Sequence, residues 1–493
     1  MNRTGKLFCA VLTMMSFYTG VEAAEPLQMV TDSHVVEDAI QAEMNRFVDE
    51  PMVYSDSGLL FNQYKDTVVV SPKKETSAVV IGIDDVVKAA IYKSRDIKMS
   101  KLTLAQAETA VGTAAAAKNP SVNYQWKYSK IKPTYKEMEV QGQRVKIPIN
   151  HLYNQGINLT WPIWTGGAVE GAIDAARYGR NIASIGVYQA EAEAKLEAVK
   201  AYYKYMEALN LSEVAAEAVK NLDKHMNNVQ QQYNAGIVAK LDVLASRVSL
   251  ANAKQKNIAA QNGRKLAEAN VNRLMGEAMD RNLSPADKKF PEPEFHLTME
   301  EAIAIGQKYR WELIKAGYNI KIAKEKIRIA KSGYLPKVAV GGQYGWNTAG
   351  MNGFDEGNWA LYGAISMEVF DGGSTSRKVK DAEIGLAEAQ EMLLKAKDGI
   401  ELEIRQAYLN VIAAKEQIET AAATVEQAEE AYKIAVVRYT SGVGINLDVL
   451  DAELALNQAK INHITALYNY NIGLAILEKA IGIPAVMHKE FQK

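Results

Sequence analysis

The chain has 493 residues and a formal net charge of -1 at pH 7, with a sequence pI near 6.7. Its length would allow roughly two or three globular domains, and its hydrophobic content of 48% supplies ample material for burial. The near-neutral charge argues against a nucleic-acid-binding protein, because such a protein needs a basic surface to neutralise phosphates.

The first segment is predicted to be a secretory signal peptide over residues 1–23. A basic start at Met1–Lys6 precedes an apolar run over residues 7–18, and small residues follow before Glu25. A run of about 12 residues is too short for a spanning helix, which needs about 20. We expect cleavage after Ala23 or Ala24.

The only cysteine, Cys9, lies within this segment. The predicted mature chain therefore has no disulfide and no cysteine-based metal site. No later stretch is long and apolar enough for a helical membrane anchor, so we expect an exported protein in which any membrane span uses strands. Residues 24–80 are assigned to an N-terminal extension.

Two copies of one structural unit make up most of the remaining chain. At a constant offset of 206 residues, four features recur: Trp164–Gly167 and Phe370–Gly373, Ala201–Tyr202 and Ala407–Tyr408, Leu241–Leu244 and Leu447–Leu450, and Gly276 and Gly482. We assign the first repeat to residues 81–276, a crossover linker to 277–297, the second repeat to 298–482 and a C-terminal tail to 483–493. The first copy carries ten extra residues, in the polar segment around 132–146.

Each repeat is predicted to contain a helical stretch of about 35 residues, a pair of strands, one very long helix, a glycine turn and a second helix of about 35 residues. The first long helix is expected from about Ala168 to Tyr233, because its apolar residues recur in steps of three and four and it lacks proline. At 1.5 Å per residue it would be roughly 100 Å long, so it can pack against two shorter helices placed end to end. Gly236 and Gly442 then form the tip turns, in the left-handed conformation that favours glycine.

Four segments alternate polar and apolar residues as strands do: 121–130, 153–161, 337–347 and 359–370. A strand of about ten residues tilted near 45° crosses roughly 25 Å, the apolar height of an outer membrane. The alternative is a soluble, half-buried sheet. In lipid, the four strands of one chain cannot close by themselves, and open edges are not tolerated there. Several chains must then share one barrel, and two copies would supply eight strands whereas three would supply twelve.

The predicted fold class is therefore α+β and mainly α. It consists of a duplicated long α-helical hairpin that forms a coiled-coil tunnel, with a four-strand contribution per protomer to a shared transmembrane β-barrel. The aromatic residues of the predicted strands suit the two interfaces of a membrane.

These features resemble the TolC-like outer membrane efflux protein family over roughly residues 83–482. The resemblance rests on the duplication, on the Tyr-x-x-Gly segments that precede Leu-Asp-Val-Leu, and on the strand-to-helix turns at Gly166, Gly167, Gly372 and Gly373. It implies a homotrimer whose twelve-stranded barrel lies in outer membrane lipid and continues into a helical tunnel through the periplasm. It also implies that the tip docks to a periplasmic adaptor protein and an inner membrane pump.

The resemblance further implies a gate at the periplasmic entrance. Asp448 and Asp451 match aspartates that ring this entrance in the family, and Tyr439 matches a tyrosine that helps to hold it shut. Asp242 is the corresponding aspartate of the first repeat. In a trimer, Asp448 and Asp451 would bring six carboxylates to the narrowest point, a ring that favours cations. Gly444 occupies the position where the family has an arginine, which puts a closed state held by charge pairing in doubt.

The tip turns at Gly236 and Gly442, together with Tyr233, are the expected docking site for the adaptor. Other interpretations of the tip residues stay open. An aspartate in the first turn of a helix is often only a cap or a partner of the helix dipole, and Asp242 suits this interpretation equally well. Tyr233 and Tyr439 would otherwise be ordinary residues of the helix contact.

No catalytic, metal or cofactor motif is evident. The six histidines lie far apart, and His225 and His463 are interpreted as surface or helix-contact residues. We therefore expect neither enzyme activity nor a cofactor. The predicted function is an outer membrane exit channel of a tripartite efflux pump or a type I secretion system, conducting substrates from an inner membrane transporter and periplasmic adaptor to the outside. The alternative is a non-channel coiled-coil stalk, periplasmic or on the surface, with a structural or adhesive role.

Overall fold

The structure is a computed structural model that describes residues 78–140, 143–287, 289–348 and 357–482. All of these belong to one compact unit, Val68–Lys493. The predicted signal peptide, nearly all of the N-terminal extension and the C-terminal tail lie outside the described residues. Within the described ranges, no helix has both the length and the apolar character needed to cross a membrane.

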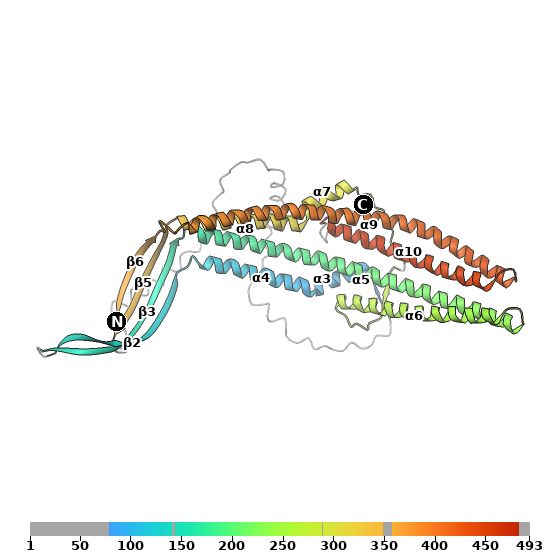
Figure 1. Cartoon of the computed structure of the whole chain (residues 1–493), viewed down its shortest axis with the longest axis horizontal. Coiled ribbons are helices and arrows are strands. Elements are labelled where there is room, and N and C mark those ends of the chain that lie inside the picture. The colour runs from blue at the N-terminus through green and yellow to red at the C-terminus, as the bar shows by residue number, and fades with distance from the viewer. Residues whose placement is uncertain (1–77, 141–142, 288, 349–356, 483–493) are drawn as a thin grey trace. The chain divides into compact units, whose positions relative to one another are not determined.

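The two repeats contain the same main elements in the same order (Figure 1). Those of the first repeat are β1 (Val79–Ile81), α3 (Ile83–Lys93), α4 (Arg95–Ala116), β2 (Ser121–Val140), β3 (Gln143–Trp164), α5 (Ala168–Asn234) and α6 (Lys240–Met275). Those that follow are β4 (Leu283–Pro285), α7 (Met299–Tyr309), α8 (Trp311–Lys331), the 3-10 helix η3 (Ser332–Tyr334), β5 (Lys337–Thr348), β6 (Asn358–Ser366), α9 (Ser374–Thr440) and α10 (Asn446–Ala480).

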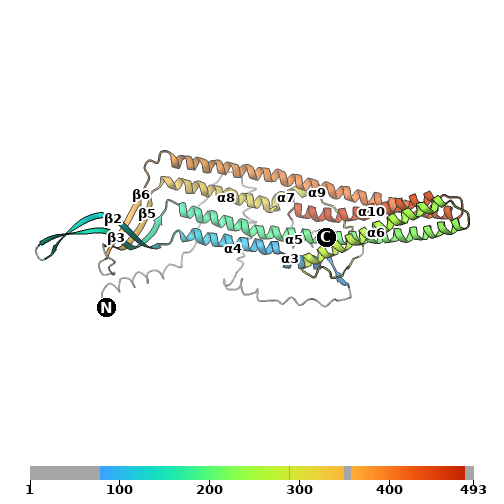
Figure 2. The same ribbon diagram turned by 60° about the horizontal axis from the view of Figure 1, so that its bottom comes forward.

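The two long helices, α5 and α9, organise the helical part. Each has 67 residues, which corresponds to about 100 Å. In the half next to the strands, α5 packs between α4 and α8, and α9 packs on α8. In the other half, α5 packs between α6 and α10, and α9 packs on α10 (Figures 1 and 2). Each long helix thus packs along shorter helices placed end to end, which confirms the arrangement predicted from the helix lengths.

The Gly-Gly turns explain why the long helices begin where they do. Gly167 and Gly373 have φ values of 87° and 79°, a region that side chains with a Cβ disfavour. The residue before each glycine pair caps the helix that follows. Thr165 Oγ1 accepts from Val169 N at 3.2 Å, and Asp371 Oδ2 accepts from Thr375 N at 2.6 Å. The Thr-Gly-Gly and Asp-Gly-Gly sequences therefore both start a long helix, and Thr-Gly-Gly also follows directly after the end of β3 at Trp164.

The helical stretch that opens each repeat was predicted as one helix of about 35 residues, and this prediction is wrong. It breaks after 11 residues in both copies, at Ser94 and at Arg310, whose ψ angles of 128° and 125° are not helical. Ser94 restarts the helix by accepting a hydrogen bond from Ile97 N at 3.3 Å. Beside this break, Lys93 Nζ donates to the backbone oxygen of Gly276 at 3.4 Å, at the end of α6.

Arg310 holds the second break together with the end of α10. Its side chain is 6% exposed and donates to the backbone oxygens of Lys479 and Ala480, each at 3.2 Å. Glu403 of α9 accepts a third hydrogen bond at 2.5 Å, and Glu312 forms an ion pair at 2.9 Å. A cation at a helix C-terminus satisfies carbonyls that lack a partner within the helix. Sequence periodicity cannot detect this contact, because the partners lie 93 to 170 residues away.

The four long strands form one antiparallel sheet in the order β2-β3-β5-β6. The strands β2 and β3 are longer than predicted, because the ten extra residues prolong their hairpin with pairs that run from Thr134–Ile149 to Val140–Gln143. A register shift surrounds Pro133, which has no N–H to donate. The strand β6 ends at Ser366, earlier than predicted, because its partner β5 begins opposite this residue at Lys337.

The register places most of the large apolar residues of the four strands on one face. Tyr124 pairs with Ile157, Ile157 with Tyr344, and Tyr344 with Trp359, so one row crosses the whole sheet. We name this set the apolar sheet face; its members are Val122, Tyr124, Trp126, Tyr128, Tyr153, Ile157, Leu159, Trp161, Trp164, Val338, Val340, Tyr344, Trp359, Leu361 and Ile365. Many of these side chains are exposed, with Leu361 at 74% and Ile365 at 76%. The other face carries mainly polar or small residues such as Asn123, Gln125 and Gly341, with Leu152 and Tyr362 as exceptions.

A second, two-stranded sheet was not predicted. The strand β4 forms within the segment assigned as the crossover linker and pairs in parallel with β1. The hydroxyl of Tyr205 on α5 donates to the backbone oxygen of Leu283 at 2.7 Å and fixes this sheet to the long helix. Strands of three residues are too short for a periodic signal, so only tertiary contacts reveal them.

The Arg310 contact leads to a prediction of stability. We expect Arg310→Ala to lower the free energy of unfolding by about 2 to 3 kcal/mol, because two buried helix carbonyls lose their donor and two partly exposed glutamates lose their cation. Thermal or chemical unfolding followed by circular dichroism measures this change. Arg405→Ala is the matched control, since Arg405 is an exposed residue of the same region of α9 whose only ion pair in the described ranges is with Glu401, four residues away, beside a weak contact with Met299 Sδ. An equal loss in both variants would contradict the proposed contribution of Arg310.

Candidate functional site at the helical tip

The tip turns join the long helices to the helices that run back from the tip. In the first turn, Gly236 has a φ of 75° and Ile237 N donates to the backbone oxygen of Gln232 at 2.9 Å. In the second turn, Gly442 has the same φ, and Val443 N donates to the backbone oxygen of Arg438 at 3.0 Å. Both glycines therefore have the left-handed conformation that the sequence predicted.

Gly444 has a local structural reason for being glycine. Its N–H donates to the backbone oxygen of Arg438 at 3.0 Å. A Cβ on Gly444 would lie 3.0 Å from three atoms of Arg438 and Tyr439, closer than ordinary van der Waals contact. The turn thus folds back tightly on the end of α9, and an arginine at this position would require the backbone to shift.

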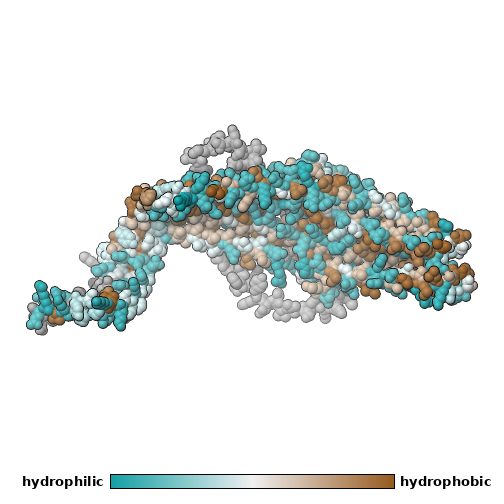
Figure 3. Space-filling model, in the orientation of Figure 1, coloured by the Kyte–Doolittle hydropathy of each residue, from teal (hydrophilic) through white to brown (hydrophobic). Residues whose placement is uncertain are grey.

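The surface around the two turns is apolar. Exposed hydrophobic side chains come from both hairpins: Ile237, Leu241, Leu244 and Val248 from the first, and Val443, Ile445, Leu447 and Leu454 from the second. Tyr233 is also partly exposed, at 38%. Hydrophobic residues gather at this end in the space-filling view (Figure 3). We name this set, with Tyr233, the apolar tip surface. Exposed apolar patches of this kind mark contacts with other molecules.

The three aspartates singled out from the sequence lie at the starts of the helices that leave the tip, where Asp448 and Asp451 are exposed and Asp242 is half-buried. Asp448 and Asp451 lie on one face of α10, three residues apart. Asp242 occupies the first turn of α6. The N-caps of these helices are Ala239 and Ile445, and neither helix has a side-chain cap hydrogen bond. Within the described part of the chain, the carboxylates of Asp448 and Asp451 make no hydrogen bond or ion pair, so both are available to face a neighbouring molecule.

Tyr439 differs from the aspartates because it is buried, with 4% exposure, in a core cluster that includes Val243 and Val449. Its ring meets the ring of His225 edge-on, with centroids 5.0 Å apart. Its hydroxyl has no hydrogen-bond partner among the described residues. Burial, and secondly the negative charge of Asp242, raise the pKa of Tyr439 above its ordinary value. In the isolated protomer this tyrosine holds helices together and does not face solvent.

A buried polar cluster next to Tyr439 could not be identified from the sequence. Asn446 Nδ2 donates to the backbone oxygen of Asp242 at 3.2 Å. Its Oδ1 accepts from Ser246 Oγ at 3.1 Å and lies 2.7 Å from His225 Nε2. Because Oδ1 can only accept, the neutral imidazole carries its proton on Nε2. We name His225, Ser246, Asn446 and Tyr439 the tip cluster; it joins α5, α6, α9 and α10, and thus both hairpins.

A comparison of the two repeats contains a weak signal for this cluster. The position of Asn446 is Lys240 in the first copy, and the position of Ser246 is Ala452 in the second. The two copies therefore differ where the hairpins meet. The chemical meaning of the difference depends on packing, because a buried amide must find partners that no periodic pattern specifies.

Glu453 is a second buried polar group, one step further from the tip. It is 2% exposed, and its Oε1 accepts from Asn221 Nδ2 at 3.3 Å and from Asn457 Nδ2 at 3.2 Å. Burial raises the pKa of this carboxyl. The matching position in the first repeat is Arg247, which is exposed and donates to Gln230 at 3.1 Å. At these matching positions, one hairpin thus carries an acidic residue and the other a basic residue.

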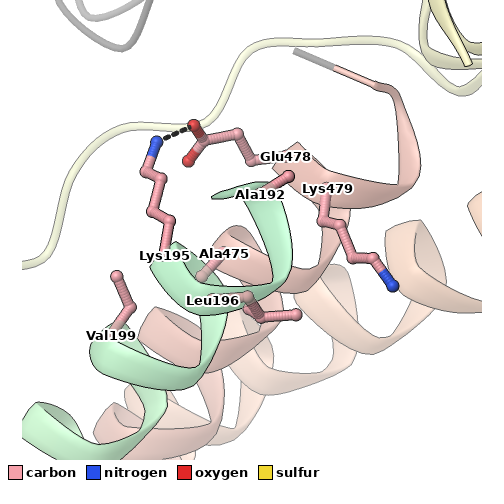
Figure 4. Close-up of a pocket in the computed structure, with 7 residues that line it drawn as sticks. All are labelled: Ala192, Lys195, Leu196, Val199, Ala475, Glu478 and Lys479. Atoms are coloured by element: carbon pink, nitrogen blue, oxygen red, sulfur yellow. Dashed lines mark hydrogen bonds and ion pairs between the residues drawn. The ribbon is translucent and has the colours of Figure 1, made fainter. Parts of the chain in front are cut away.

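The cavity in Figure 4 is partly open to solvent and lies between α5 and α10, away from the tip cluster. Its volume is about 20 Å³, enough for about one water molecule. Lys195 donates to Glu478 at 2.5 Å beside it, and Leu196 and Val199 complete part of its wall. The cavity is too small to hold a substrate. No group of three or more metal-binding side chains occurs in the described ranges.

The tip cluster leads to a prediction of pH dependence. Burial lowers the pKa of His225 below its ordinary value of 6.5, although the hydrogen bond to Asn446 partly opposes this effect. The unfolded chain therefore binds a proton before the folded one does, and stability decreases as the pH falls below about 6.5 toward the lowered pKa. We expect the thermal unfolding midpoint of the native protein to decrease when the pH is lowered from 7.5 to 5.5. The midpoint of His225→Gln should decrease less, because glutamine keeps a hydrogen-bond donor but does not titrate.

His296→Gln is the control for the His225 prediction, because His296 is 81% accessible and its contact with the equally exposed Glu294 at 2.9 Å is screened by solvent. It should retain the pH dependence of the native protein. Glu453 is present in every variant, so its contribution to the pH dependence of stability cancels when the variants are compared. Identical pH profiles for the native protein and His225→Gln would contradict the prediction.

Comparison with known proteins relates both repeats to one family. The family model described as "Outer membrane efflux protein" matches residues 86–277 and 308–483. The outer membrane protein TolC of Escherichia coli (strain K12) is 23% identical over 304 residues, which cover 58% of this chain and 61% of TolC. The matched part thus spans about three fifths of the length of this relative.

Solved structures share the fold at low sequence identity. The outer membrane protein VceC of Vibrio cholerae gives a TM-score of 0.67 and 19% identity, over 81% of this chain and 96% of VceC. The CmeC outer membrane channel of Campylobacter jejuni gives 0.69 and 17%, over 84% of this chain and 90% of CmeC. These likenesses confirm the predicted mainly α fold with duplicated helical hairpins and a sheet. Because the family model matches both repeats and most of the chain, the protein belongs to the outer membrane efflux protein family.

Proposed function

We propose that this chain is one protomer of an outer membrane exit channel, which conducts substrates from an inner membrane transporter and a periplasmic adaptor to the outside. The observation that carries this proposal is the exposed apolar sheet face, which lies at one end of the helical part. The two lateral sides of that helical part also carry exposed apolar residues. No catalytic step is needed for this role, and we assign none. The proposal covers both a tripartite efflux pump and a type I secretion system.

The open sides support assembly from identical copies. Within the described strands, β2 pairs only with β3, and β6 pairs only with β5. The helices α4 and α6 lie on the β2 side, whereas α9 lies on the β6 side. Each side carries exposed apolar residues: Met99, Leu102, Ile258 and Leu266 on one, and Ile384, Leu402 and Leu409 on the other. If the β2 side of one copy fits the β6 side of the next, repeated contacts of this kind close into a ring. Three copies would supply twelve strands.

The apolar sheet face supports a position in lipid. From Tyr153 to Trp164, β3 advances about 36 Å, or about 27 Å along the membrane normal at a tilt near 40°. Aromatic residues stand at both ends of this stretch, with Trp161 and Trp164 near the helices and Trp126, Tyr128 and Tyr153 toward the hairpin end. This distribution suits the two interfaces of an outer membrane. A stalk released without detergent would have no need of such a face.

The apolar tip surface supports docking of a periplasmic adaptor. It includes residues of both hairpins around Gly236 and Gly442, with Tyr233 at its margin. In this proposal the adaptor covers the apolar side chains and connects the channel to the inner membrane pump. The substrate class is then a property of the pump and not of this chain.

Asp448 and Asp451 are proposed to form the entrance ring, with six carboxylates in a trimer and Asp242 nearby. Carboxylates crowded around one axis attract cations and repel one another. In place of an arginine at Gly444, the tip cluster with Tyr439 holds the two hairpins of each protomer together. The entrance is therefore latched within protomers by buried polar contacts.

The assembly can be tested on the α9 side. We expect the double substitution Leu402→Glu and Leu409→Glu to shift the detergent-solubilised protein from trimer to monomer, because charges on this side would lose hydration in the contact between copies. Light scattering coupled to size-exclusion chromatography measures the mass. Ile237→Glu is the control, since it adds a charge at the equally exposed tip, where no contact between copies is proposed. A trimer that survives the double substitution would contradict the assignment of α9 to the contact.

The entrance ring can be tested in planar lipid bilayers. We expect the native protein to form cation-preferring pores, and Asp448→Asn with Asp451→Asn to reduce the cation preference and the block by multivalent cations several-fold, because the ring loses its charge. Asp280→Asn with Glu294→Gln removes the same number of carboxylates from the crossover segment and serves as control. Failure of the native protein to conduct would overturn the proposed function, whereas unchanged selectivity in the ring variant would overturn only the role of the two aspartates.

A further inference from the structure

We propose that Lys130 and Lys132 bind the phosphate groups of anionic lipid headgroups in the outer leaflet of the membrane. The inference rests on the proposed function, because it takes the apolar sheet face to be the lipid-facing surface. It adds a specific lipid contact on the first hairpin of each protomer, which the second hairpin does not share.

The register places Lys130 directly beyond the aromatic end of the apolar sheet face. Tyr128 pairs with Tyr153, and the next pair on the same face is Lys130 with His151. The rings of Tyr128 and Tyr153 have centroids 5.3 Å apart, and His151 meets Tyr153 edge-on at 5.8 Å. The order along this face is therefore an apolar stretch, then a group of aromatic rings, then a cation. Aromatic rings prefer the headgroup level of a membrane, and long cationic side chains reach past it toward phosphates.

Lys132 adds a second cation at the same level. It lies in the register shift between Lys130 and Thr134 and is exposed, as Lys130 is. Neither lysine makes an ion pair or hydrogen bond within the part of the chain that the structure describes. Two exposed cations without a protein partner next to a lipid-facing surface are available to an anion.

The surrounding sequence leaves this positive charge uncompensated. Residues 121–136 and 147–164 contain no aspartate or glutamate. The acids nearest along the hairpin lie further out. Glu137 forms an ion pair with Lys146 at 3.4 Å, and Glu139 lies opposite Arg144 in the strand register. In a surface without acids, the two cations attract an anionic headgroup with no competing negative charge nearby.

The second hairpin lacks this feature. In the described parts of β5 and β6, the only cation is Lys337, at the end next to the helices. The contact therefore comes from the ten additional residues and the register shift that begin the extended part of the first hairpin. A lipid surface fits better than a folded protein partner, because Lys130 continues the face whose apolar part is proposed to lie in lipid, and Lys132 follows it two residues later.

The experiment uses the full detergent-solubilised protein and diphosphorylated lipid A as the probe, with bound lipid counted by native mass spectrometry. We expect Lys130→Gln with Lys132→Gln to reduce bound lipid several-fold, and Lys130→Arg with Lys132→Arg to retain it. Dephosphorylated lipid A should bind the native protein as weakly as diphosphorylated lipid A binds the glutamine variant. The difference should shrink as ionic strength rises.

The matched control is Lys127→Gln with Lys337→Gln, which removes two cations from the opposite face of the same sheet. This variant should bind lipid as the native protein does. Equal binding by the native protein and the Lys130/Lys132 glutamine variant, or an equal loss in the control, would overturn the inference. Pore conductance separates the two proposals. If the glutamine variant conducts and binds lipid as the native protein does, only the lipid contact is rejected. If the native protein does not conduct, the proposed function is rejected.

Discussion

The edges of the four-stranded sheet, which are unpaired among the described strands, are the constraint on which the rest of this structure depends. A strand edge presents N–H and C=O groups that must find partners, and lipid offers none. The two lateral sides of the helical part also carry exposed apolar residues. In the proposed assembly, an identical neighbour supplies the partners that each side lacks. The proposed ring, membrane position and entrance all follow from this requirement.

The two repeats share one plan but differ at both ends of the long helices. At the tip, the first copy contributes His225 and Ser246 to the tip cluster, and the second contributes Asn446 and Tyr439. A buried polar cluster is stable only when its members are satisfied, so it specifies how the two hairpins meet. Duplication provided two similar hairpins, and their divergence produced a contact that neither could make alone. The lone hydroxyl of Tyr439 is the exception within this cluster, because it lacks a partner among the described residues.

At the other end, divergence changed the strands. The first hairpin is longer and carries Lys130 and Lys132, whereas the second has no cation at its hairpin end among the described residues. The two helix breaks, at Ser94 and Arg310, also differ between the repeats. A short side chain caps one helix, and a buried guanidinium joins three helices at the other. The shared architecture therefore tolerates different local solutions to the same backbone problem.

The sequence by itself determined the duplication, the long helices, the four strands and the tip glycines. These features depend on periodicity and on backbone conformation, which neighbouring residues in the chain specify. It also identified Asp448 and Asp451, whose roles stay predictions. Only the tertiary structure decided that Tyr439 is buried, that the opening helices break, and that Asn446 joins both hairpins. Such contacts link residues about 90 to 220 positions apart, so their energy depends on packing geometry and not on a local pattern.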